Sequence, residues 1–163
     1  MKSLTVVILI VCFLFISALP VQAASEGDFS TQRPLLEDCL RNEESFGFEL
    51  KDYPIEHQTQ ALLNISVKFR FIPEVKDDTN LYPDVVLIVE DIREFLINYP
   101  NETDYWEIVN KNLVNFLMDQ YTSIASLCIK LEINPTIREN YERYTVVTVT
   151  RRDQCPLISQ CAM

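Results

Sequence analysis

Alternation of apolar and polar residues marks the clearest strands along this chain. Within residues 61–72, apolar side chains from Leu63 to Phe71 alternate with polar or basic ones, and this period of two predicts a β-strand with one buried face. The same alternation runs through residues 125–133, and residues 141–151 are rich in Thr, Val and Tyr. We expect these two segments to be strands that pair across the Asn134-Pro135 turn. The pattern leaves open an extra strand, either in residues 46–50 or just before residue 61.

Two intervening segments carry apolar residues at helical spacing. The first starts at Pro83 or Asp84 and is stopped by Pro100, and the second is opened by Asp104-x-x-Glu107, which resembles a capping box. The two stripes are Val85, Ile88, Val89, Ile92, Phe95, Leu96 and Tyr99, then Trp106, Val109, Leu113, Phe116 and Leu117. The order strand, helix, helix, strand, strand predicts an α+β fold. In this fold, two antiparallel helices cover one face of an antiparallel sheet.

The first 23 residues have the features of a secretory signal peptide. Lys2 gives a short basic start, residues 4–19 are almost all apolar, and Val21 and Ala23 are small residues at positions −3 and −1. A membrane anchor is the alternative, because the apolar run is only slightly too short to span a bilayer. The small-residue site and the lack of a flanking basic stop favour cleavage after Ala23. We therefore expect a secreted protein with no membrane association once the leader is removed.

Composition and charge set the domain organisation and the classes of partner. We expect a signal peptide in residues 1–23, an N-terminal arm in 24–60, the α+β domain in 61–152 and a Cys-containing tail in 153–163. The chain carries 24 acidic and 14 basic residues, a net charge of −10. This balance argues against nucleic acids and anionic membrane surfaces, which bind Lys and Arg patches.

Four cysteines remain after Cys12 leaves with the leader: Cys39, Cys128, Cys155 and Cys161. In an oxidising compartment they can pair in three ways, and the sequence does not choose among them. We expect the cysteines to pin the tail, and the arm near Cys39, onto the domain. Cys128 lies inside a predicted strand and is alternatively a buried free thiol. The spacings lack paired C-x-x-C units, so we expect no zinc site.

Missing residue types exclude several kinds of chemistry. His57 is the single histidine, so one chain cannot build a multi-histidine zinc or iron site, and its polar neighbours suggest a surface position. Gly27 and Gly47 are the only glycines, which excludes Gly-rich loops that hold phosphates or dinucleotides. Carboxylates are plentiful, but nothing singles out a catalytic pair. The sequence identifies no catalytic residue and no cofactor.

Two sequons for N-glycosylation are present, at Asn64-Ile65-Ser66 and at Asn101-Glu102-Thr103. Asn101 falls in the turn between the predicted helices and is the candidate acceptor. Asn64 falls in the middle of a predicted strand, where a glycan would interrupt the assembly of the sheet.

The element order, together with one acidic residue, resembles the tunnelling fold (T-fold) of urate oxidase, 6-pyruvoyl-tetrahydropterin synthase and dihydroneopterin aldolase. Glu132, in Leu131-Glu132-Ile133-Asn134-Pro135, is similar to the carboxylate that anchors the pterin N–H groups in the synthase branch. A bidentate carboxylate suits such a planar, guanidine-like edge. The resemblance covers residues 61–152 and implies a homo-oligomer in which sheets join edge to edge into a ring. Lys68 and Arg70 would line its interior as candidate ligand-binding bases, unless they form a solvated polar face.

The chain also departs from these enzymes. It lacks the three zinc-binding histidines and the Cys-His-Asp relay of the synthases, and it is too short for the tandem duplication of urate oxidase. We therefore expect a secreted, non-catalytic T-fold protein that oligomerises and can bind a small planar, pterin- or purine-like ligand near Glu132. One alternative is a metal-independent enzyme acting on pterin- or purine-like substrates. Another is an extracellular protein-interaction module.

Overall fold

The computed structural model describes residues 32–41, 43–57, 60–76, 78–100, 103–137, 139–159 and 161. The chain divides into two compact units, Met1–Arg33 and Pro34–Met163, and the fold below is that of the second unit. The predicted signal peptide and the candidate glycosylation site Asn101 lie outside the described residues. Among the helices that are described, none has the length and apolar character needed to cross a membrane.

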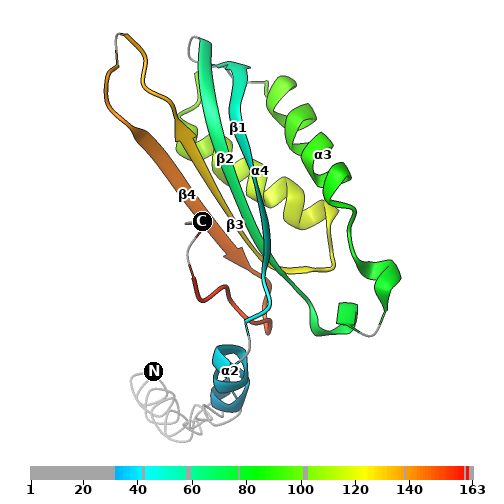
Figure 1. Cartoon of the computed structure of the whole chain (residues 1–163). Helices are drawn as coiled ribbons and strands as arrows, with labels where there is room; N and C mark the ends of the chain where they lie inside the picture. Colours follow the sequence, from blue (N-terminus) through cyan, green and yellow to red (C-terminus); the bar gives the residue numbers. More distant parts are fainter. Residues whose placement is uncertain are drawn as a thin grey trace, which may run out of the picture. The chain divides into compact units, whose positions relative to one another are not determined.

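Four antiparallel strands form one sheet in the order β1-β2-β3-β4 (Figure 1). They span Phe46–Glu56, Gln60–Phe71, Ile124–Ile133 and Arg143–Thr150. The strands β2, β3 and β4 match the expected ones, and β1 is the extra strand that the pattern left open. The sheet thus begins at Phe46, within the segment expected to be an N-terminal arm, which also contains helix α2 (Gln32–Arg41).

A bulge in β1 explains why its full length was hard to recognise. The pairing with β2 shifts between Leu50 and Tyr53, and Asp52 within the bulge has a positive φ of 51°. Phe48 and Leu50 pack against the core before the bulge, whereas Tyr53 and Ile55 do so after it. The apolar positions therefore change from even to odd along the strand, which breaks the period of two.

Two helices, α3 (Val85–Ile97) and α4 (Trp106–Gln120), run in opposite directions on the same face of the sheet (Figure 1). Asp84 caps α3, since its carboxylate accepts a hydrogen bond from the Val86 amide at 2.8 Å. The short 3-10 helices Pro73–Lys76 and Thr79–Leu81 lie in the acidic connection from β2 to α3. The predicted α+β arrangement is confirmed.

The expected capping box at the start of α4 is wrong. Tyr105, not Asp104, is the N-cap residue of α4. The Asp104 carboxylate instead accepts a hydrogen bond from the Tyr99 hydroxyl at 2.7 Å, at the end of the preceding helix.

The core lies between the sheet and the two helices. The odd-numbered residues of β2 and β3 and one stripe from each helix are almost completely buried there. They include Leu63, Ile65, Val67 and Phe69 from β2, Ile88, Ile92 and Leu96 from α3, Leu113 and Leu117 from α4, and Leu127, Ile129 and Leu131 from β3. The even-numbered residues from Asn64 to Arg70 in β2 and from Ser126 to Glu132 in β3 consequently point to the opposite face, which we call the polar face of the sheet.

Candidate functional site

The polar face brings the candidate ligand-binding residues onto two neighbouring strands. The cross-strand pairs on this face are Asn64 with Glu132, Ser66 with Lys130, Lys68 with Cys128, and Arg70 with Ser126. Lys68 and Arg70 therefore lie toward one end of the face and Glu132 toward the other. Four residues along β3 separate Cys128 from Glu132, which corresponds to about 13 Å at the rise of a strand.

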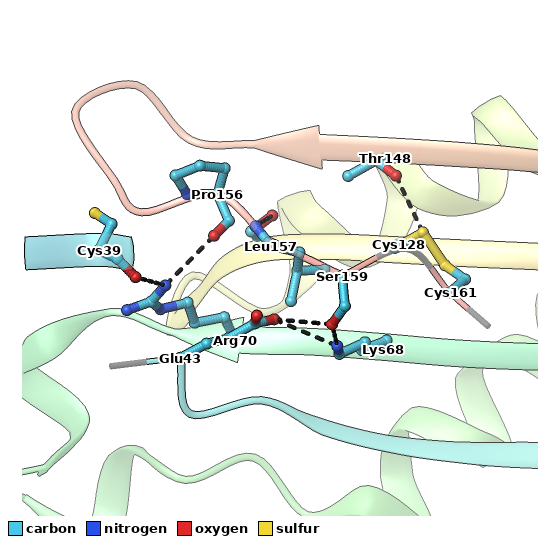
Figure 2. A network of polar contacts seen from close by, with 11 residues as sticks. Cys39, Glu43, Lys68, Arg70, Cys128, Thr148, Pro156, Leu157, Ser159 and Cys161 are labelled. Carbon is cyan, nitrogen blue, oxygen red and sulfur yellow. Dashed lines mark hydrogen bonds and ion pairs between the residues drawn. A yellow bond between two sulfur atoms is a disulfide. The ribbon is translucent and has the colours of Figure 1, made fainter. Parts of the chain in front are cut away.

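The C-terminal tail (residues 153–159 and 161) crosses the end of the polar face that carries the two bases (Figure 2). Cys161 forms a disulfide with Cys128 in the middle of β3, with a Cα–Cα distance of 5.8 Å. Lys68 donates a hydrogen bond to the Ser159 hydroxyl, and Arg70 donates one to the Pro156 carbonyl at 3.4 Å. The tail thus covers polar-face positions that a lone sheet would leave open.

The segment before β1 reaches the same two bases from the other side. Glu43 forms an ion pair with Lys68 at 3.3 Å, and the carbonyl of Cys39 accepts a hydrogen bond from Arg70 at 3.4 Å. Cys39 is in turn disulfide-bonded to Cys155, with a Cα–Cα distance of 5.4 Å. The expectation that cysteines pin the tail and the arm onto the domain is therefore met. The alternative of Cys128 as a free thiol is wrong, because the tail folds back onto its strand.

Glu132 occupies the end of the polar face beyond these tail contacts. Lys130 donates a hydrogen bond to its carboxylate at 2.5 Å, and this bond, with a smaller contribution from Asn64, lowers the pKa of Glu132 below its usual value. Tyr144 of β4 lies directly opposite Glu132, and the Lys130 ammonium lies 5.1 Å from the centroid of the Tyr144 ring. The structure thus gathers a carboxylate, an ammonium and an exposed aromatic ring. Lys68 and Arg70 do not belong to this group.

Three polar side chains close a ring of hydrogen bonds at the β1 bulge. The Asp52 amide donates to the side-chain oxygen of Asn64 at 3.1 Å, Asn64 donates to Asn134 at 3.1 Å, and Asn134 donates back to the Asp52 carboxylate at 3.0 Å. The side-chain nitrogen of Asn64 is therefore already committed within the fold. That Asn64 is a poor glycan acceptor stays a prediction, and its hydrogen-bond partners could not be inferred from the sequence.

The surface position expected for His57 is wrong. Its side chain is 3% exposed and hydrogen-bonds through Nε2 to the Asp104 carbonyl at 2.9 Å. The Trp106 ring packs against it with a centroid distance of 4.7 Å. The polar neighbours of His57 along the chain gave no sign of this burial, because the covering residues come from the start of α4. Within the described residues, no group of three or more His, Cys, Asp or Glu side chains could hold a metal ion.

Comparisons with known proteins identify the fold but no close relative. No family model and no curated protein matches the sequence. The structure is similar to a protein assigned as dihydroneopterin aldolase (FolB) from Vibrio cholerae O1 biovar El Tor, with a TM-score of 0.55 and 12% identity. The match covers 68% of this chain and 99% of that one. The chain has a tunnelling fold.

Another tunnelling-fold structure, the archaeosine synthase QueF-Like in its apo form, matches with a TM-score of 0.45 and 11% identity. That match covers 66% of this chain and 94% of the other. The match to the dihydroneopterin aldolase structure confirms the T-fold resemblance, expected from element order, as a statement about architecture. At these identities, activity does not transfer with the fold.

Proposed function

We propose that this protein is a secreted, non-catalytic T-fold protein that oligomerises through the edges of its sheet. The observation that carries the proposal is the tail on the polar face. Lys68 and Arg70, two of the candidate ligand-binding residues, are bonded instead to Ser159 and Pro156 of the chain's own tail. The Cys128–Cys161 disulfide fixes that arrangement. This use of the face favours a stable scaffold over an enzyme that must admit substrate there.

The open edges of the sheet support assembly. Within the described residues, β1 and β4 are the edge strands, and each presents backbone N–H and C=O groups without a strand partner on its outer side. Pairing β1 of one subunit with β4 of the next would satisfy these groups in a closed ring. Two cysteine pairs at disulfide distance suit an oxidising compartment, in agreement with the predicted signal peptide.

Light scattering of the purified protein at micromolar concentration tests the assembly, and we expect an oligomer. A monomer at that concentration would contradict ring formation.

N-terminal sequencing of the same sample should begin near Ala24, whereas Met1 retained in a membrane fraction would contradict secretion. Turnover of a pterin or a purine without added metal would instead favour the metal-independent enzyme.

A second function, binding of a small planar ligand, is favoured by the arrangement at Glu132. This carboxylate is ionised at neutral pH, and Lys130 stabilises its charge by lowering its pKa, so it can accept a pair of ligand N–H groups. Tyr144, directly opposite and 66% exposed, offers a ring on which a pterin or purine could stack. Lys130 would have to share the carboxylate with the ligand.

Thermal melting with a panel of pterins and purines tests this second function. A ligand that raises the wild-type melting temperature should lose its effect in Glu132→Gln, because losing a charge-assisted bidentate contact costs roughly 2–4 kcal/mol of binding energy. Glu139→Gln is the matched control, since Glu139 is also ion-paired, to Arg143 at 2.6 Å. If no member of the panel stabilises the wild type, the protein has no such ligand.

A further inference from the structure

A separate pocket lies at the end of the sheet that carries Arg70, where the start of β1 meets the end of β2. Its volume is about 130 Å³, and its walls come from β1, β2, the connection to α3 and the C-terminal tail. Arg70 lies in its wall, six residues along β2 from Asn64, the cross-strand partner of Glu132. This corresponds to about 20 Å at the rise of a strand, so the pocket is distinct from the Glu132 group.

Three aromatic rings surround the pocket. The ring centroids of Phe46 and Phe71 are 5.0 Å apart, those of Phe71 and Tyr82 are 5.0 Å apart, and those of Phe46 and Tyr82 are 6.4 Å apart. Phe46 and Tyr82 nevertheless remain 37% and 40% exposed. Aromatic surface that stays accessible beside a pocket can gain burial when a ligand enters.

Covalent and polar links hold the walls in place before any ligand arrives. The Cys39–Cys155 disulfide fixes the tail at the pocket. Arg70 hydrogen-bonds the carbonyls of both Cys39 and Pro156 (Figure 2). Val75 closes another side and is completely buried. A site assembled in advance loses little conformational entropy on binding, which favours affinity for a small ligand.

Size and charge define the ligand class. Among the described residues that line the pocket, Arg70 and Glu44 are the charged ones, and their charges are opposite. A cavity of about 150 Å³ lined by apolar side chains is known to hold one benzene ring, so 130 Å³ suits one ring better than two fused rings. We propose that this pocket binds a neutral ligand with a single aromatic ring and one small polar substituent, of about the size of phenol.

Phenol and 2-naphthol are suitable probes for the mature, disulfide-intact chain, with binding followed by ligand-observed NMR and by titration. Phenol should bind and 2-naphthol should not. Tyr82→Ala should weaken phenol binding about two- to tenfold through loss of one ring contact. Tyr141→Ala is the matched control, because Tyr141 is 54% exposed and does not line the pocket, and it should leave the affinity unchanged.

A filling variant checks the location independently. Gln154 lines the pocket, and Gln154→Trp should place an indole there and abolish phenol binding, while circular dichroism confirms that the variant is folded. Glu132→Gln should not alter phenol binding, which separates this site from the planar-ligand site. The proposal is overturned if phenol fails to bind the wild type or if 2-naphthol binds equally well. It is also overturned if Tyr141→Ala weakens binding as much as Tyr82→Ala does.

Discussion

The ion pair between Lys130 and Glu132 shows how much one partly exposed pair can contribute to the stability of the fold. Lys130 bonds its carboxylate, and this hydrogen bond is the main reason that the pKa of Glu132 lies below its usual value. Both side chains keep nearly a third of their surface exposed, so water screens the attraction. We therefore expect the pair to stabilise the fold modestly and to affect ligand binding more than stability.

Stability measurements across pH should reveal this contribution. Because folding lowers the pKa of Glu132 from its ordinary value of 4.5, the stabilisation is present above pH 4.5 and is lost as the pH falls through the folded-state value. Glu132→Gln should reduce the free energy of unfolding by at most about 1 kcal/mol at pH 7, and the difference should be smaller at pH 3 than at pH 7. Urea unfolding at both pH values provides the measurement.

Lys130→Met serves as the control for this prediction. In that background, Glu132→Gln should change the free energy of unfolding much less at pH 7, since the partner is already gone. A loss of several kcal/mol in Glu132→Gln alone would instead show that Glu132 is a structural residue.

At the scale of elements, the sequence predicted the type and bounds of those helices and strands that bury one regular face in the core. The strand β2 alternates cleanly, and α3 begins at a real cap, Asp84, so both were identified nearly to the residue. The bulge in β1 and the recruitment of Asp104 by Tyr99 depend on contacts with other segments. Local periodicity cannot report such contacts, and this is why the strand length and the capping box were missed.

The pairing of β1 with β2 depends on a close backbone approach at Gly47. A Cβ atom added there would lie 2.7 Å from the carbonyl oxygen of Val67, a backbone atom that cannot move without disturbing the sheet. Gly47→Ala should therefore reduce the free energy of unfolding by about 1–3 kcal/mol, as overpacking typically does. Urea denaturation measures the effect, and Glu49→Ala, on an exposed site of the same strand, should change it by no more than about 0.5 kcal/mol. Equal effects of the two substitutions would show that the approach is not strained.

At the scale of the whole molecule, the sequence predicted that the tail is pinned to the domain but not where the tail lies on the sheet. The sequence supplied four cysteines and the idea of a pinned tail, but three pairings were open. The pairing that forms depends on Cys39 lying next to Cys155, although 116 residues separate them along the chain. Only the folded sheet, with the segment before β1 and the C-terminal tail packed on it, brings these two cysteines together. The same long-range contacts occupy Lys68 and Arg70, whose alternation alone suggested an open or solvated face.

Removing each disulfide separately tests how the tail contributes to the whole fold. The entropy of the unfolded chain predicts that removing the disulfide with the longer loop lowers the free energy of unfolding more. For Cys39→Ser/Cys155→Ser, which removes a link between residues 116 apart, the loss should be about 5 kcal/mol. For Cys128→Ser/Cys161→Ser, which removes a link between residues 33 apart, the loss should be about 4 kcal/mol. Urea unfolding of both double variants gives the order, and hydrogen exchange at the Leu157 amide, which donates to the Ser126 hydroxyl, shows whether the tail still covers β3. If the shorter loop proves the more important, the tail stabilises the protein mainly through its native contacts on the polar face rather than by restricting the unfolded chain.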